Sequence, residues 1–197
     1  MKIMLKNVRL AFPALWRPAK IKGSGDGPPK YNCCGLLPRN HPQLAELKGA
    51  MKSAAVEKWG AKADAIYKAC VAAQKICLRD GDSKPDYDGF EGNFFVSASC
   101  ATRPSVFDRD KTELNESDGK PYAGCYVNLS LEIWAQDNEW GKRINAQLRG
   151  VQFVRDGDAF TAGAKAADAD EFDDLGMGED SAGAPAEADA GLDELMM

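Results

Sequence analysis

The segment YVNLSLEIW, residues 126–134, alternates between large aliphatic residues and mostly polar ones. The aliphatic residues occupy every second position, with Val127 the first and Ile133 the last. This two-residue period is typical of a β-strand with one buried face, because successive side chains point to opposite sides of a strand. We therefore expect the domain to be organised around this strand.

A second alternating segment, residues 143–153, follows after a short connection. Its alternation shifts by one residue at Gly150 and then continues to Phe153. A one-residue shift at a glycine indicates a β-bulge, which bends a strand around a barrel. The two segments are therefore predicted to pair as neighbouring strands of a barrel.

Periodicity predicts the other elements as well. Two helices are expected between the second strand and the strand that begins at Phe94, because apolar residues recur there at helical spacing. The further predicted strands are residues 2–12, 30–37, 75–79 and 94–102, and the predicted helices are residues 41–59 and 61–74.

Three of the connections combine basic residues with an aromatic one. Residues 13–29 contain four prolines and three glycines and are predicted to be a long loop around Trp16. Residues 103–122 form a second long polar loop, and residues 135–142 a hairpin loop that exposes Trp140. Large rings in such loops have no evident core to enter, so we interpret them as candidate binding residues.

Charge divides the chain into two parts. Residues 1–155 contain 24 lysines and arginines against 17 acids, a net charge of +7. Residues 156–197 contain one lysine against 13 acids, a net charge of −12, which gives −5 for the whole chain. Alanine, glycine and acidic residues cannot bury enough apolar surface to offset the entropy lost on folding. We therefore predict a folded domain at residues 1–160 and a disordered acidic tail at residues 161–197.

Several classes of function are disfavoured. The sequence has no apolar run of 18 residues and no N-terminal signal pattern, so we expect a cytoplasmic location, in the host cell if a phage encodes the protein. The six cysteines and the lone His41 lack the close ligand pairs of a zinc site, and the acids of residues 80–91 lack the spacing of a calcium loop. No motif for nucleophilic or acid–base catalysis is present. We expect no metal, no cofactor and no enzyme activity.

A basic strand-rich domain with aromatic rings in its loops favours binding of single-stranded nucleic acid. Cations then follow the phosphates and the rings stack on bases without regard to sequence. A double-stranded target fits less well, because no predicted helix carries the basic stripe that enters a major groove. The candidate binding residues are Trp16, Lys20, Lys22, Lys30, Phe107, Arg109, Trp140, Lys142 and Arg143.

The order of these elements resembles the single-stranded-DNA-binding proteins of tailed bacteriophages. The similar segments are KYNCCGLLP (30–38), FFV (94–96), GCYVNL (124–129), LRGVQF (148–153) and the acidic tail. The resemblance implies an OB-fold-like five-stranded barrel with inserted helices, and a role in phage DNA replication, recombination or repair. It also implies that the tail binds replication proteins. The candidate partner-binding residues are Leu192, Asp193, Glu194, Leu195, Met196 and Met197.

Two other classes of function stay open. The chain could be a recombination-accessory or protein-interaction protein that works mainly through its acidic tail, with the body as a scaffold. It could also be a metal-dependent nuclease, which cleavage of DNA would reveal. A homodimer is compatible with the sequence, and neither the binding-site size nor a preference for DNA over RNA follows from it.

Overall fold

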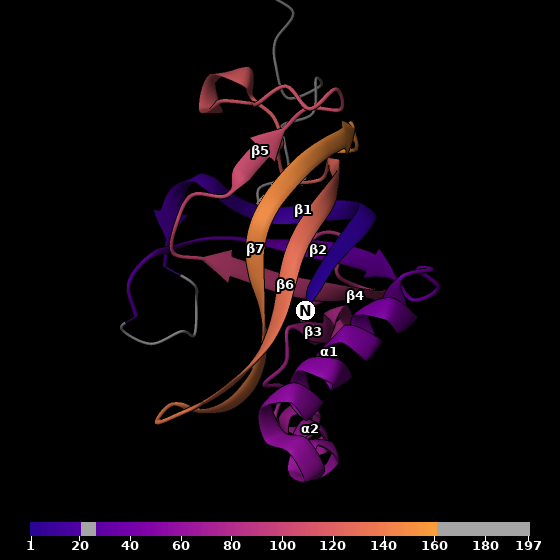
Figure 1. The fold of residues 1–197 in the computed structure, drawn as a ribbon. Coiled ribbons are helices and arrows are strands. Elements are labelled where there is room, and N and C mark those ends of the chain that lie inside the picture. Colours follow the sequence, from indigo (N-terminus) through magenta and orange to yellow (C-terminus); the bar gives the residue numbers. More distant parts are fainter. Residues whose placement is uncertain (21–26, 161–197) are drawn as a thin grey trace, which may run out of the picture. The chain divides into compact units, whose positions relative to one another are not determined.

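Five strands form a closed barrel in the computed structural model, which describes residues 1–20 and 27–160 (Figure 1). They are β1 (Lys2–Ala19), β2 (Lys30–Pro38), β4 (Asn93–Cys100), β6 (Tyr126–Asn138) and β7 (Gly141–Arg155). Neighbouring strands pair antiparallel in the order β4, β2, β1, β6 and β7. A parallel pairing of β4 with β7 closes the barrel. The predicted OB-like barrel is confirmed.

The alternating segment of β6 supplies much of the barrel core. Val127, Leu129 and the two aliphatic residues that follow at alternate positions are all fully buried. Gly35 of β2 faces them, and a Cβ atom there would lie 2.7 Å from the Cδ1 atom of Leu129. The missing side chain therefore lets β2 close over the core.

Register shifts interrupt the pairing of the long strands. Ser130 pairs with Gly150 while Leu131 pairs with Leu148, so Arg149 is the extra residue beside the glycine. The bulge predicted at Gly150 is confirmed. A second register shift lies in β1 around Asn7, whose φ of +53° is unusual for a residue other than glycine.

Strand β1 is longer than the sequence indicates. The predicted loop begins at Pro13, but Ala14 pairs with Asn32 and Ala19 with Lys30. Register shifts on both sides of Ala14 accommodate the prolines, which supply no backbone N–H to a regular ladder. Trp16 therefore lies on a strand, so the prediction that places it in a loop is wrong.

The hairpin between β6 and β7 is tighter than predicted. The strands pair as far as Asn138 and Gly141, which leaves only Glu139 and Trp140 in the turn. Gly141 has a φ of +96°, a conformation that suits a tight turn. Lys142 and Arg143 consequently lie on β7 and not in the loop.

Both predicted helices are present between β2 and the strand that follows. Helix α1 (Leu44–Trp59), the 3₁₀ turn η1 (Gly60–Lys62) and helix α2 (Ala63–Ala72) lie together on one side of the barrel (Figure 1). Leu47 and Met51 of α1 are fully buried in the core. Among the described residues, no helix is long and apolar enough to cross a membrane.

Short elements complete the fold. Strand β3 (Leu78–Asp80) pairs with β4, and the 3₁₀ turn η2 (Gly81–Ser83) follows it. Strand β5 (Ser105–Phe107) pairs parallel with β7 inside the segment predicted to be a polar loop, and η3 (Glu116–Asp118) comes later in that segment. Sequence reasoning missed β5 because three residues are too few to show a period.

Candidate nucleic-acid interface

The β1–β2 and β6–β7 connections each lead into a strand that pairs with β4. Tyr31 at the start of β2 pairs with Cys100 at the end of β4. On the other side of β4, Ser99 pairs with Gln147 of β7, which leads back to the hairpin. OB-folds bind oligonucleotides with these two loops and the strand face between them. Lys22 of the first connection lies outside the described residues.

Trp140 occupies the tip of the hairpin with 78% of its surface exposed. Lys142 forms an ion pair with Asp137, which also accepts a hydrogen bond from the Nε1 atom of Trp59 at 3.0 Å. The hydrogen bond from Lys142 is the main reason that the pKa of Asp137 lies below its usual value. Arg143 is exposed and takes part in none of the ion pairs among the described residues. It is therefore the freer cation of the two.

Trp16 is half-buried and packs against the barrel core. The guanidinium of Arg103 lies 4.8 Å from the centre of its ring, a cation–π geometry. Arg17 beside it forms an ion pair with Glu116 at 3.2 Å. Lys20 directly follows β1, Lys30 begins β2, and both are exposed. Sequence reasoning missed Arg103. This residue reaches Trp16 only because residues 103–118 fold back toward β1.

Phe107 and Arg109 lie at the opposite end of β7 from the hairpin. Phe107 pairs with Gln152, and the guanidinium of Arg109 lies 5.6 Å from the ring of Phe153. Strand rise places Gln152 about 35 Å along β7 from Gly141. The structure therefore brings Trp16, Lys20 and Lys30 together. It separates Phe107 and Arg109 from the candidate residues of the hairpin, which are Trp140, Lys142 and Arg143.

A face that the sequence did not single out joins these regions. We call the outward side of β2 and β4 the outer face. Its rungs pair Asn32 with Ser99 and Cys34 with Ser97, while Leu36 pairs with Phe95 farther along. Except for that last rung, the side chains are small and half-exposed. Period-two alternation in both segments was the signal that could have marked them.

Arg79 of β3 borders the outer face. Its Nη2 atom donates a hydrogen bond to the Ser97 hydroxyl at 3.1 Å, and its guanidinium lies 4.9 Å from the centre of the Phe95 ring. Its Nε atom is buried and has no hydrogen-bond partner among residues 1–20 and 27–160. Cys34 contacts the same hydroxyl at 3.5 Å, and burial is the main cause of the raised pKa of its thiol. The outer face thus combines small polar groups with a positive charge.

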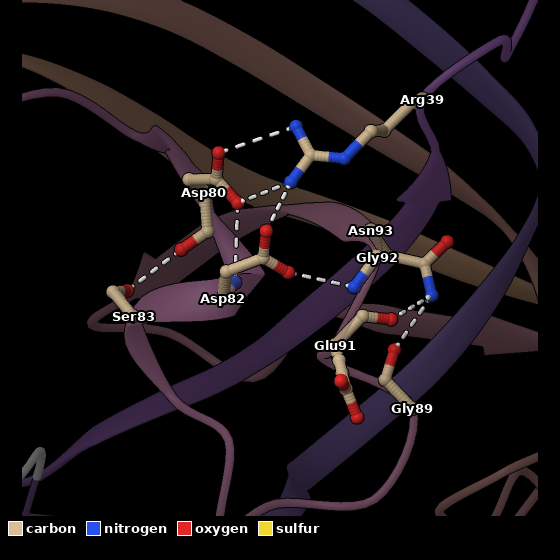
Figure 2. A network of polar contacts seen from close by, with 8 residues as sticks. All are labelled: Arg39, Asp80, Asp82, Ser83, Gly89, Glu91, Gly92 and Asn93. Carbon is tan, nitrogen blue, oxygen red and sulfur yellow. Dashed lines mark hydrogen bonds and ion pairs between the residues drawn. The ribbon is translucent and has the colours of Figure 1, made fainter.

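The acidic segment between β3 and β4 is a closed loop held by side-chain contacts within it and with Arg39 (Figure 2). Arg39 pairs with both Asp80 and Asp82. Asp82 in turn accepts a hydrogen bond from the backbone N–H of Gly92 at 2.7 Å, which ties the two ends of the loop together. The pKa of Asp80 is lowered, first by the N–H of Asp82 and then by Arg39. These carboxylates therefore serve to hold the loop in shape.

Comparison with known proteins decides the family. Residues 1–182 match the family described as the ssDNA-binding protein of Enterobacter phage Enc34. The chain belongs to this family. It is also 50% identical over 183 residues to "Putative protein p50" of Acyrthosiphon pisum secondary endosymbiont phage 1, covering 91% of this chain and 97% of that protein. The resemblance to phage single-stranded-DNA-binding proteins is thereby confirmed.

Solved structures show the same fold as this Enc34-family chain. The single-stranded-DNA-binding protein of bacteriophage Enc34 in complex with ssDNA is 30% identical, with a TM-score of 0.68, and the match covers 80% of this chain and 88% of that one. The ssDNA-binding protein gp2.5 of bacteriophage T7 is 12% identical with a TM-score of 0.55, over 85% and 97% of the two chains, which shows likeness of fold alone. The Enc34 family is one of DNA-binding proteins and not of enzymes.

Proposed function

We propose that this chain binds single-stranded DNA without sequence preference and protects it during phage DNA replication, recombination or repair. The observation that carries the proposal is the position of the outer face between β1 and β7. Trp16, Lys20 and Lys30 lie near the β1–β2 junction on one side, and Trp140 and Arg143 lie in the β6–β7 hairpin on the other. Aromatic rings around an OB-type strand face can stack on bases. Cations that form no ion pair among the described residues can contact the phosphates of the strand. The Enc34 relative solved with ssDNA supports the same function.

Titration with poly-dT and with duplex DNA tests this function. We expect poly-dT to quench tryptophan fluorescence at much lower concentrations than duplex DNA, because stacking needs unpaired bases. Equal affinity for duplex DNA would contradict the proposed mode of binding. Metal-dependent cleavage of the DNA would instead support the nuclease alternative.

We propose further that residues 161–197, which lie outside the described residues, form an acidic tail with two roles. The tail would compete with DNA for the basic face of the body, and its last six residues would bind a replication protein in the host cytoplasm. The place where it starts supports the first role. The Phe160 ring lies 4.4 Å from the Arg9 guanidinium, and a Cβ atom on Gly89 would meet that ring. Arg9 pairs with Leu36, so the tail begins beside the outer face.

Truncation after Phe160 is expected to tighten binding of poly-dT about tenfold at low salt. A tethered segment reaches an effective concentration near the millimolar range. Even a weak contact of the tail with the body therefore lowers substantially the fraction of protein molecules that are free to bind DNA. The gain should shrink at high salt, because screening weakens the competition. Fluorescence titrations of the two proteins at two salt concentrations measure both effects.

Removal of residues 192–197 alone provides the matched control. This deletion removes two of the 11 acids that follow Phe160 and keeps nine. Affinity for DNA should therefore change little, whereas binding of a replication protein should be lost. If the protein truncated after Phe160 binds poly-dT at low salt no more tightly than the full chain, the tail does not compete with DNA.

A further inference from the structure

Four aromatic rings cluster at the Phe95 end of the outer face. Phe90 and Phe95 are fully buried and lie 5.1 Å apart between ring centres. Phe12 and Tyr87 both pack on Phe90 and meet each other edge to face at 5.0 Å. Phe12 is 42% exposed and Tyr87 is 37% exposed. A buried aromatic base thus supports two rings that are open to solvent.

The backbone at Phe12 has an unusual, strained conformation. Phe12 has a φ of +49°, where a bulky side chain is rare and costly, and it lies in the register shift between Ala11 and Ala14. Such strain persists where the surrounding structure enforces it, commonly at functional sites. Here it accompanies a phenyl ring that is left partly in water.

A lysine lies over the cluster. The Nζ atom of Lys84 is 5.1 Å from the ring centre of Phe95 and between 5.6 and 6.0 Å from the other three. Lys84 takes part in none of the six ion pairs formed among the described residues. The guanidinium of Arg79 lies 4.9 Å from the centre of the Phe95 ring, and its buried Nε–H has no partner in the described part of the chain. Lys84 therefore lies beside the exposed rings, and Arg79 lies beside the buried ring that supports them.

The loop that carries Lys84 and Tyr87 is fixed in advance. Figure 2 shows Arg39 bridging the carboxylates at its start, while the amide of Asn93 donates to the carbonyl of Gly89 at 2.9 Å. A Cβ atom on Gly81 would lie 2.0 Å from the carbonyl oxygen of Phe90, so the loop packs tightly onto its own base. A preorganised loop loses little entropy when a ligand binds.

We propose that Phe12 and Tyr87 form a base-stacking subsite for single-stranded DNA, with Lys84 contacting an adjacent phosphate. The subsite lies along β2 from the β1–β2 connection, about 20 Å from Lys30 by strand rise, and the small polar side chains of the outer face lie between. This inference rests on the proposed function and extends its contact surface beyond the residues predicted from the sequence. Exposed rings accept any base, and cations follow the backbone.

Substitution of Tyr87 tests the subsite directly. Tyr87→Leu is expected to weaken poly-dT binding about tenfold, and Tyr87→Phe less than about twofold, because the ring and not the hydroxyl stacks. Lys84→Gln should reduce the magnitude of the slope of log K against log salt by about 0.7, the value for one phosphate contact on a single strand. Val56→Ala on α1, where Val56 is 57% exposed, is the control that should leave affinity unchanged.

A footprint gives a readout that does not depend on mutant stability. Cys34 is partly exposed and the other five cysteines are buried, so a thiol reagent reports on the outer face of the native protein. Poly-dT should slow alkylation of Cys34, and a photoactivated iododeoxyuridine oligonucleotide should crosslink to the peptide containing Tyr87. If Tyr87→Leu binds poly-dT as tightly as the wild-type protein does, the proposed subsite is wrong. Crosslinks confined to other peptides would overturn it as well. Failure of the wild-type protein to bind poly-dT would instead overturn the proposed function.

Discussion

A fourfold rise in salt, from 50 to 200 mM, is expected to weaken poly-dT binding about 300-fold. Each phosphate contact on a single strand contributes about −0.7 to the slope of log K against log salt, so about six contacts give a slope of about −4. The structure offers six cations near the connections and the outer face that form no ion pair among the described residues. They are Lys20, Lys30, Arg79, Lys84, Arg103 and Arg143.

Two neighbouring residues of the hairpin make a matched test of this reasoning. Lys142 is already paired with Asp137, whereas Arg143 is exposed and unpaired among the described residues. Arg143→Gln should therefore flatten the salt dependence by about 0.7, and Lys142→Gln should change it less. Affinity that does not vary with salt would rule out a phosphate-tracking surface.

Sequence reasoning predicted the parts of the fold in which the polarity of each residue matches its burial. Alternation through Val127 and Ile133 marks a strand with one buried face, because burial repeats with the period of the backbone. The shift at Gly150 similarly marks a bulge, which the pairing with Ser130 confirms. Local periodicity was sufficient for β6, β7 and the two helices.

The errors arose where long-range pairing overrides local composition. Four prolines and three glycines in residues 13–29 favour a loop, yet β1 continues through Pro13 and Pro18 because β2 pairs with its far half. The aromatic cluster had no signal in the sequence at all. Phe12 and Tyr87 are 75 positions apart, and only the β1–β2–β4 pairing brings them together.

Trp16 and Trp140 show the same limit at the level of the candidate site. In the sequence both are large rings in polar, basic connections, and the same role was predicted for each. In the structure Trp140 is 78% exposed at a turn, whereas Trp16 packs against the core under Arg103. The two residues therefore call for different expectations on mutation.

Trp140→Ala is expected to weaken poly-dT binding by about 1–3 kcal/mol, or about 5- to 150-fold, because one stacked base would lose its aromatic partner. The melting temperature should stay nearly unchanged, since so exposed a side chain contributes little buried area. Fluorescence anisotropy of a labelled oligonucleotide measures the first effect and calorimetry the second. Trp140→Phe keeps an aromatic face and should restore most of the affinity.

Trp16→Ala serves as the contrasting variant. It removes a half-buried ring that packs against the core and holds the guanidinium of Arg103, so both affinity and melting temperature should fall. A loss of melting temperature in Trp140→Ala without a loss of affinity would assign Trp140 a structural role. Binding would then depend on the outer face and on Phe12 and Tyr87, where the crosslinking experiment identifies the contacted peptide independently.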